Sequence, residues 1–374
     1  MILRKFAYTT SENFDDYWRL DPINLENINL FVAKNATGKT RTVNAMFSLS
    51  KLMIGKGRKV PARYMAEFVD ESNICQYELI IEAEMVIAEK LTINGITRIL
   101  RERMGKGEIY AEQLTKNISF QLPRNNLAIL KRDILQHPYL EPFFEWANSV
   151  HYYAFGSSMN QEYGAKFDTP DSLIDGNSDN TVQVFVAGVL KFKGRFKKCI
   201  LSSMKEIGYD LLGIDALKHT YARKTIGFED YILQVVESDR NIPVIQIDMS
   251  RGMFRALSMI IHLTYHVLMK TSVTFIIDDI GEGLDFDRSS RLIKLLIETA
   301  EKNDNIQLIM STNDRFVMNS VPLEYWQVIQ RNGGECQVFN YHNSKEKFDE
   351  FEYTGLNNFD FLRTDFLNSK WEPV

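Results

Sequence analysis

The sequence predicts an α/β fold, on three observations. Short apolar runs have the length and composition of buried strands, at 28–32, 273–277 and 306–310. Apolar side chains then recur at helical spacing over 43–52, 252–269 and 287–301. Finally, residues 74–100 are rich in strand formers, and Asn94-Gly95 stands between two such runs, which predicts an antiparallel hairpin. Strands that alternate with helices, beside a separate hairpin region, are typical of an α/β architecture.

Composition excludes several other classes of protein. The 374 residues suffice for one large domain or two smaller ones, and 45% hydrophobic with 25% charged residues is typical of a globular chain. The net charge of −5 does not draw the whole chain toward nucleic acid. Three scattered cysteines without CxxC spacing argue against a disulfide framework and a zinc site. With no leader and no membrane-spanning run, we expect a cytoplasmic protein with no membrane contact.

A phosphate-binding loop follows the first predicted strand. Residues 33–40 read Ala-Lys-Asn-Ala-Thr-Gly-Lys-Thr, the P-loop pattern with Ala33 in place of its first glycine. In such a loop, backbone N–H groups wrap the phosphates, the lysine adds a positive charge, and the hydroxyl binds Mg²⁺. Gly38, Lys39 and Thr40 are therefore candidate nucleotide-binding residues.

The apolar run at 273–277 ends on two carboxylates, Asp278 and Asp279, as a Walker B element does. The first acid can hold Mg²⁺, and the second can orient and deprotonate an attacking water. Leu284-Asp285 follows six residues later, and this continuation is more specific than the acidic pair alone. The alternative, a strand that ends in a solvated acidic turn, is disfavoured by the P-loop upstream.

Two weaker elements accompany these motifs. Ser250 and Gly252 open the predicted helix that precedes the Walker B strand, where a signature sequence would present a helix N-terminus to a phosphate. Taken alone, Ser250 would be an ordinary helix cap. Asn313 follows the predicted strand at 306–310 and would face the γ-phosphate, although a simple strand-to-loop transition explains it equally well.

In order and spacing, these elements resemble the ABC-type ATPases of the SMC, RecF and OLD group. Residues 278–285 align without gaps to the family's Asp-Glu-Pro-x-x-x-Leu-Asp. Ile280 in place of proline, and a signature of Ser250-Arg251-Gly252 followed by Arg255, are more similar to OLD proteins. The resemblance covers about residues 1–100 and 245–330. It implies an ABC-ATPase-type head with a mixed central sheet, an antiparallel β subdomain and a helical insertion.

The resemblance also implies cofactors, roles and an assembly. ATP and Mg²⁺ would lie between two copies in a head-to-tail homodimer or higher oligomer. The implied nucleotide-binding residues are Asn35, Gly38, Lys39, Thr40, Arg41, Ser250 and Gly252, the last two reaching across the dimer. Thr40 and Asp278 would bind the metal, and the catalytic set would be Asp279 as base, Asp285 as D-loop acid, and Asn313 at the switch-histidine position.

Several positions depart from the family pattern. Ala33 and Ala36 replace glycines, which alanine permits only if the loop backbone keeps to conformations open to it. Asp279 replaces glutamate, so its carboxylate lies one methylene further from the water. Asn313 cannot carry the positive charge of a protonated histidine. We therefore expect ATP binding with slow hydrolysis.

The organisation predicted from these motifs has four parts. They are an N-terminal lobe at 1–108 with the P-loop and antiparallel sheet, a helical insertion or lid at 109–240, a C-terminal lobe at 241–335 with the signature, Walker B, D-loop and switch, and a tail at 336–374. Residues 109–225 are expected to be mostly helical. The tail is rich in aromatic residues and either packs back on the ATPase or docks a partner.

Other motifs allow a functional and a structural interpretation. His262 and His266 have the spacing of metal ligands, but helix packing is the better interpretation because HExxH is not completed. His342-Asn343 hints at an HNH nuclease without a ligand set, and we reject that reading. The basic run at 191–198, with Phe192 and Phe196 in it, predicts either nucleic-acid contact or a solvated helix face with two core aromatics.

From the sequence we expect a stand-alone ATPase subunit whose nucleotide-gated dimer regulates a separately encoded effector such as a nuclease. Too few residues follow Asn313 for the nuclease domain of OLD proteins, and the long coiled coil of SMC proteins is missing. By analogy, such subunits occur in bacterial anti-phage defence. The alternatives are a DNA-repair or DNA-clamp ATPase that binds nucleic acid directly, and a nucleotide-binding scaffold that does not hydrolyse ATP.

Overall fold

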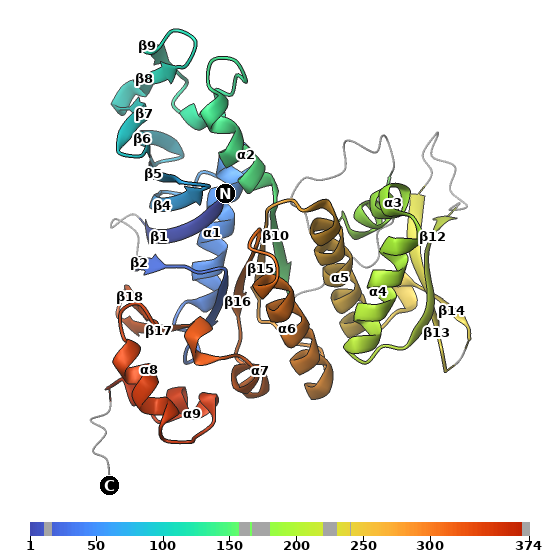
Figure 1. Cartoon of the computed structure of the whole chain (residues 1–374). Coiled ribbons are helices and arrows are strands. Elements are labelled where there is room, and N and C mark those ends of the chain that lie inside the picture. The colour runs from blue at the N-terminus through green and yellow to red at the C-terminus, as the bar shows by residue number, and fades with distance from the viewer. Residues whose placement is uncertain (11–16, 157–164, 167–179, 220–229, 240, 369–374) are drawn as a thin grey trace.

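The computed structural model describes residues 1–10, 17–156, 165–166, 180–219, 230–239 and 241–368. One fourteen-stranded sheet runs through the molecule (Figure 1). Its parallel part comprises, in spatial order, β10 (Val150–Ala154), β15 (Val273–Asp278), β16 (Ile306–Ser311), β3 (Ile28–Val32) and β17 (Trp326–Asn332). The three apolar runs predicted to be buried strands are β3, β15 and β16, and this prediction is confirmed.

The rest of the large sheet is mainly antiparallel. It comprises β18 (Glu335–Phe339), β2 (Arg19–Asn24), β1 (Ile2–Thr10), β4 (Ala62–Asp70), β5 (Asn73–Glu82), β6 (Met85–Ile93), β7 (Ile96–Arg101), β8 (Lys106–Ala111) and β9 (Lys116–Gln121). Strand β18 pairs antiparallel with β17 and parallel with β2, and all pairs from β2 to β9 are antiparallel. Asn94 and Gly95 join β6 to β7 with positive φ at both residues, as the hairpin signal predicts.

The described helices flank this sheet. They are α1 (Lys39–Met53), α2 (Glu141–Asn148), α3 (Thr181–Phe192), α4 (Gly194–Glu206), α5 (Arg251–Met269), α6 (Phe286–Glu301), α7 (Arg315–Ser320), α8 (Lys345–Glu352) and α9 (Asn358–Arg363). A smaller sheet beside α3 and α4 contains β11 (Ala165–Lys166), β12 (Leu211–His219), β13 (Asp230–Glu237) and β14 (Pro243–Ile245) (Figure 1). None of the described helices is long and apolar enough to cross a bilayer.

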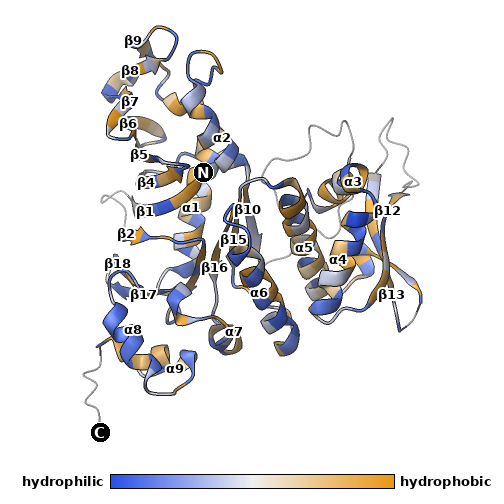
Figure 2. Cartoon of the chain, in the orientation of Figure 1, coloured by the Kyte–Doolittle hydropathy of each residue, from blue (hydrophilic) through white to orange (hydrophobic). Residues whose placement is uncertain are grey.

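The parallel strands are buried on both faces and separate two cores. On β15, Phe275 and Ile277 pack with α5 and α6, whereas Ile276 packs with α1 and α2 on the other face. A strand that is covered on both faces reads as a continuous apolar run, which explains why the sequence shows no alternation there. Much of α5 is apolar, while the peripheral α8 is mainly hydrophilic (Figure 2).

The expectation that residues 109–225 are mostly helical is wrong in part. Helices α2, α3 and α4 lie in this span, but β8 and β9 extend the antiparallel sheet to residue 121, and β10 joins the parallel part. Glu112, Gln113 and Leu114 are good helix formers in the turn between β8 and β9. Pairing with β7 and burial of Ile109 outweigh that local preference.

The aromatic C-terminal segment packs back on the sheet. Phe348, Phe351, Phe361 and Phe366 are buried, and the ring of Phe361 lies 6.3 Å from that of Trp326 on β17. These contacts favour the first of the two interpretations left open by the sequence. Trp371 lies outside the described residues.

A cluster of three buried histidines fills the space between β10 and α5. His151 on β10 contacts His266 (Nε2 to Nε2, 3.1 Å), and Tyr153 hydrogen-bonds His262. Burial lowers the pKa of His262 to about 3 and that of His266 to about 4, and it holds the pKa of His151 well below its ordinary value. His262 also contacts Oδ1 of Asn180 (2.9 Å), and His266 contacts the Thr271 hydroxyl (2.9 Å), so the packing interpretation of the pair on α5 is supported by what the two buried rings touch.

Acidification should destabilise the protein through this histidine cluster. The folded-state pKa values lie below the ordinary value of 6.5, so the unfolded chain binds more protons. The folded state therefore keeps its full free energy of unfolding above about pH 6.5, where the histidines are neutral in both states. That free energy falls as the pH drops from 6.5 toward the folded-state pKa values. Within that window, each histidine should lower the free energy of unfolding by about 1.4 kcal/mol for every pH unit of acidification. Urea unfolding at about pH 7, 6 and 5 measures the slope.

Two variants isolate the contribution of the cluster. His151→Phe keeps a ring against Phe275 and removes one titrating group, so it should reduce the pH slope by the share of about one histidine. His342→Gln is the matched control, because the His342 side chain is 43% exposed and lies outside the cluster. Equal slopes for wild type and His151→Phe would contradict this account.

Candidate functional site

The P-loop connects β3 to α1 and lines a cavity of about 470 Å³. The five P-loop residues predicted to bind nucleotide all lie on its wall, namely Asn35, Gly38, Lys39, Thr40 and Arg41. Asn313, which follows β16, lines the same cavity from the other side. Parallel pairing of β3 with β16 puts the carboxyl ends of both strands at one edge of the sheet, so these residues meet.

The backbone of the loop requires unusual conformations at two positions. Gly38 has φ +108°, and a Cβ there would lie 3.1 Å from the indole of Trp18, so glycine fits and larger residues do not. Ala36 has φ +62°, in the left-handed region that favours glycine. Ala33 has no positive φ, so its backbone conformation is open to alanine, as the sequence analysis required. The backbone conformation of Ala36 does not meet that condition.

Residues far away in the sequence hold the loop from outside. The Trp18 indole donates a hydrogen bond to the Cys336 sulfur (2.9 Å), and that thiol lies 3.4 Å from the Thr37 carbonyl oxygen. Arg331 donates to the Ala36 carbonyl oxygen at 3.1 Å. Sequence reasoning missed these three side chains because no motif connects positions about 300 residues apart.

The metal-binding residues predicted by the P-loop and Walker B motifs come together. The Thr40 hydroxyl donates to Oδ1 of Asp278 at 3.2 Å, although the two residues are 238 positions apart. The Ser311 hydroxyl donates to the same oxygen at 2.5 Å, and the Tyr152 hydroxyl donates to Oδ2 at 3.3 Å. A carboxylate beside a hydroxyl supplies the hard oxygen ligands that Mg²⁺ prefers, so this donor set fits that ion.

Asp279 lies beside Asn313. Nδ2 of Asn313 donates to the Asp279 carboxylate at 3.1 Å, and the Asp279 N–H donates to the Ser311 hydroxyl at 3.0 Å. Burial, together with the carboxylates of Asp278 and Glu282, raises the pKa of Asp279, while Lys39 and Asn313 partly oppose the shift. A raised pKa makes this carboxylate a better proton acceptor near neutral pH. Its φ of +54° is a strained conformation of the kind that clusters at functional sites.

Lys39 supplies the positive charge of the site. Its ammonium group donates to the Ala33 carbonyl oxygen at 3.2 Å. Burial lowers its pKa, and the carboxylates of Asp279 and Asp278 oppose that shift. A lysine ammonium beside the phosphate-binding loop adds the positive charge that an anionic, metal-bound ligand requires.

The remaining predicted site residues act as structural elements within this chain. The Ser250 hydroxyl caps α5 by accepting from the Met253 N–H (3.2 Å), and Asp285 caps α6. A Cβ on Gly252 would lie 2.6 Å from the Gly283 carbonyl oxygen, so glycine allows α5 to approach the Walker B turn. Across the described part of the chain, no hydrogen bond connects Ser250, Gly252 or Asp285 to the P-loop. Their predicted reach into a second subunit stays a prediction.

The basic run at 191–198 lies where α3 meets α4. Phe196 is buried against Tyr265, and Lys197 pairs with Asp215 at 2.8 Å. The other charged side chains of the run are exposed, namely Lys191, Lys193, Arg195 and Lys198. This agrees with a solvated face over core aromatics, and nucleic-acid contact stays a prediction.

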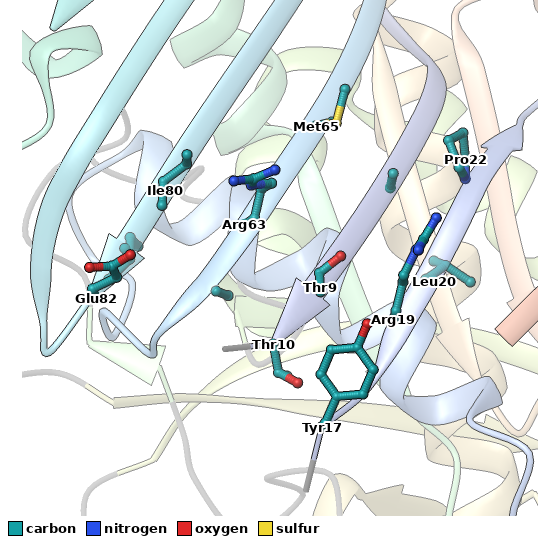
Figure 3. Close-up of a pocket in the computed structure, with 13 residues that line it drawn as sticks. Thr9, Thr10, Tyr17, Arg19, Leu20, Pro22, Arg63, Met65, Ile80 and Glu82 are labelled. Carbon is teal, nitrogen blue, oxygen red and sulfur yellow. The ribbon is translucent and has the colours of Figure 1, made fainter. Parts of the chain in front are cut away.

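A larger hollow of about 600 Å³ lies on the outer face of the antiparallel strands (Figure 3). Thr9, Arg63 and Ile80 line it from neighbouring strands, and the residues next to them in sequence face the core. Arg19 at its edge pairs with Asp21 at 3.0 Å. The predicted site residues all lie elsewhere, so this hollow is separate from the P-loop cavity.

Comparisons with solved structures identify the fold as that of SMC head domains. An SMC head bound to the C-winged-helix domain of ScpA matches with a TM-score of 0.52 and 10% identity, over 91% of this chain and 97% of that chain. An Smc head domain with an extended coiled coil, bound to the C-terminal domain of ScpA derived from Pyrococcus furiosus, matches with a TM-score of 0.51 and 10% identity, over 94% and 99%. Neither a protein-family model nor a curated protein matches the chain. The predicted fold class is confirmed, and the OLD-like subgroup stays a prediction.

Glycine at position 36 should stabilise the P-loop. Ala36→Gly removes the steric cost of the left-handed conformation, which exceeds the entropic cost of glycine, so the free energy of unfolding should rise by about 0.5–1 kcal/mol. Ala45→Gly, in the interior of α1, is the matched control and should lower it by about 1 kcal/mol. Urea unfolding measures both, and a loss of stability in Ala36→Gly would refute the strain.

Proposed function

We propose that this chain binds ATP with Mg²⁺ and hydrolyses it slowly. The observation that supports this most strongly is the meeting of Thr40 and Asp278, from the P-loop helix and the end of β15, at 3.2 Å. Asp279 follows Asp278 in the chain and accepts a hydrogen bond from Asn313, and we assign to these two residues the roles of base and γ-phosphate sensor. Two independent motifs that are joined by a hydrogen bond support a nucleotide site better than either motif alone.

Each residue has a distinct role in this proposal. Backbone N–H groups of 35–40 and the Lys39 ammonium bind the phosphates, while Thr40 and Asp278 hold Mg²⁺, which would neutralise phosphate charge. The oxygen of the attacking water forms a bond to the γ-phosphorus, and Asp279 accepts a proton from that water. The bond between the γ-phosphorus and the bridging oxygen breaks, and this oxygen leaves with ADP. The raised pKa of Asp279 favours this proton transfer.

Two features of the site support slow turnover. The Asp279 side chain is short and accepts a hydrogen bond from Asn313, so one carboxylate oxygen is already engaged. Asn313 is neutral and supplies a dipole rather than a charge to the transition state, where preorganised charge contributes strongly to the rate. We therefore propose that ATP binding and slow hydrolysis switch the protein between two states, rather than driving rapid repeated cycles as in a motor.

We extend the proposal to the assembly and its use. Ser250 caps α5 and Gly252 lies in its first turn, and we propose that this N-terminus binds a phosphate held by a second copy in a head-to-tail dimer. SMC heads with this fold are seen bound to domains of ScpA, which supports a protein partner for this chain as well. We propose that the partner is a separately encoded effector, such as a nuclease in anti-phage defence, controlled by nucleotide-dependent dimerisation.

A second candidate is an ATPase that acts directly on nucleic acid. It is favoured by the exposed charges of Lys191, Lys193, Arg195 and Lys198 at the junction of α3 and α4. Co-purification distinguishes the two, because an effector protein supports the first, whereas DNA that is retained in an ATP-dependent manner supports the second.

Calorimetry with ATP and an assay of phosphate release test the proposed activity. Lys39→Ala should abolish binding, whereas Asp279→Asn should keep binding and lower hydrolysis by about 100-fold or more, the usual loss of a general base. Asp304→Asn changes an exposed aspartate away from the site and should match wild type in both assays. Unchanged ATP binding in Lys39→Ala would refute the nucleotide site. Binding without any phosphate release would leave the scaffold alternative.

A further inference from the structure

We propose that Tyr152 is a positioning residue for the metal site, and that its hydroxyl fixes the orientation of the Asp278 carboxylate. The inference rests on the proposed function and adds a residue that none of the sequence motifs contains. Tyr152 lies on β10, the strand beside the Walker B strand, and donates to Oδ2 of Asp278 at 3.3 Å.

The geometry divides the two oxygens of Asp278 between different partners. Oδ1 accepts from Ser311 on β16 and from Thr40 on α1, while Oδ2 accepts from Tyr152 on β10. A carboxylate with partners on only one oxygen can still rotate about its Cβ–Cγ bond. Partners on both oxygens, from strands on either side of β15, define the plane of the group.

The contribution of Tyr152 should matter most when Mg²⁺ is bound. The Thr40 hydroxyl is the oxygen that would then turn to the metal, which leaves Ser311 and Tyr152 to hold the acid. Hydrogen bonds that orient a metal ligand from behind commonly change metal affinity by about 10- to 100-fold. The Tyr152 hydroxyl has the position for that role.

Packing keeps the Tyr152 ring in place. Phe47 on α1 stacks against it, with ring centroids 4.8 Å apart and an interplanar angle of 27°. A tyrosine hydroxyl keeps its proton at neutral pH, so it can donate to the Asp278 carboxylate. Because the same helix begins at the P-loop, the ring connects the phosphate-binding and metal-binding halves of the site.

The next residue provides a matched control. Tyr153 has the same side chain on the same strand, but it points to the opposite face of the sheet and hydrogen-bonds His262. Substitution by phenylalanine removes the same hydroxyl group at either position. Only the hydroxyl of Tyr152 contacts Asp278.

The experiment compares wild type, Tyr152→Phe and Tyr153→Phe by calorimetry with ATP, first in EDTA and then over a Mg²⁺ titration. Tyr152→Phe should leave Mg²⁺-free ATP binding unchanged and raise the half-saturating Mg²⁺ concentration about tenfold. In steady-state kinetics, hydrolysis at saturating Mg²⁺ should recover most of its kcat. Tyr153→Phe should follow the wild-type Mg²⁺ curve, and thermal melts confirm that both variants are folded.

The outcomes separate this inference from the proposed function. A Mg²⁺-dependent wild type and an identical Tyr152→Phe curve would overturn the positioning role alone. Wild-type protein that binds no ATP at any Mg²⁺ concentration would overturn both. In an Asp278→Asn background, Tyr152→Phe should cause no further shift, because it acts through that carboxylate. A full additional shift would also overturn the role.

Discussion

Parallel pairing of β3, β16, β15 and β10 is the constraint on which the rest of the site depends. It brings the carboxyl ends of four strands to one edge, so that residues from four distant parts of the chain meet there. Asp278 and Ser311 end β15 and β16, and they hydrogen-bond each other there. Thr40 on α1 and Tyr152 on β10 reach the same Asp278 carboxylate. A shift in register by one residue would turn Asp278 to the other face of the sheet, since side chains alternate along a strand.

The elements closest to the chemistry were predictable from the sequence, because their local requirements leave a signature. A buried strand needs a continuous apolar run, and phosphate binding needs Gly38, Lys39 and Thr40 at fixed spacing. The partners that complete the site were not predictable. Trp18 and Tyr152 belong to no motif, and only the folded structure shows that one touches the P-loop and the other Asp278. The strands in 106–121 were missed because pairing overrode helix-forming residues.

Strand β10 serves two neighbours at once. Tyr152 contacts the metal site on one face, whereas His151 and Tyr153 contact α5 on the other through the buried histidines. A displacement of α5, whose N-terminus carries Ser250, would therefore be resisted by a polar network attached to the strand beside Asp278. Such networks favour one arrangement of their parts, because an unpaired buried group is costly.

The contacts of Trp18, Cys336 and Arg331 with the P-loop affect how the protein folds during synthesis. Residues 33–40 are synthesised long before Cys336, which joins Trp18 to the loop and is separated from Trp18 by 318 positions. In the sheet, β17 and β18 lie between β3 and β2. The strands β1 and β2 therefore connect to β3 through two strands that come much later in the sequence. During translation β2 and β3 therefore carry unpaired edges until β17 and β18 have emerged. Such edges attract other chains, which makes synthesis, rather than the finished fold, the stage most exposed to aggregation.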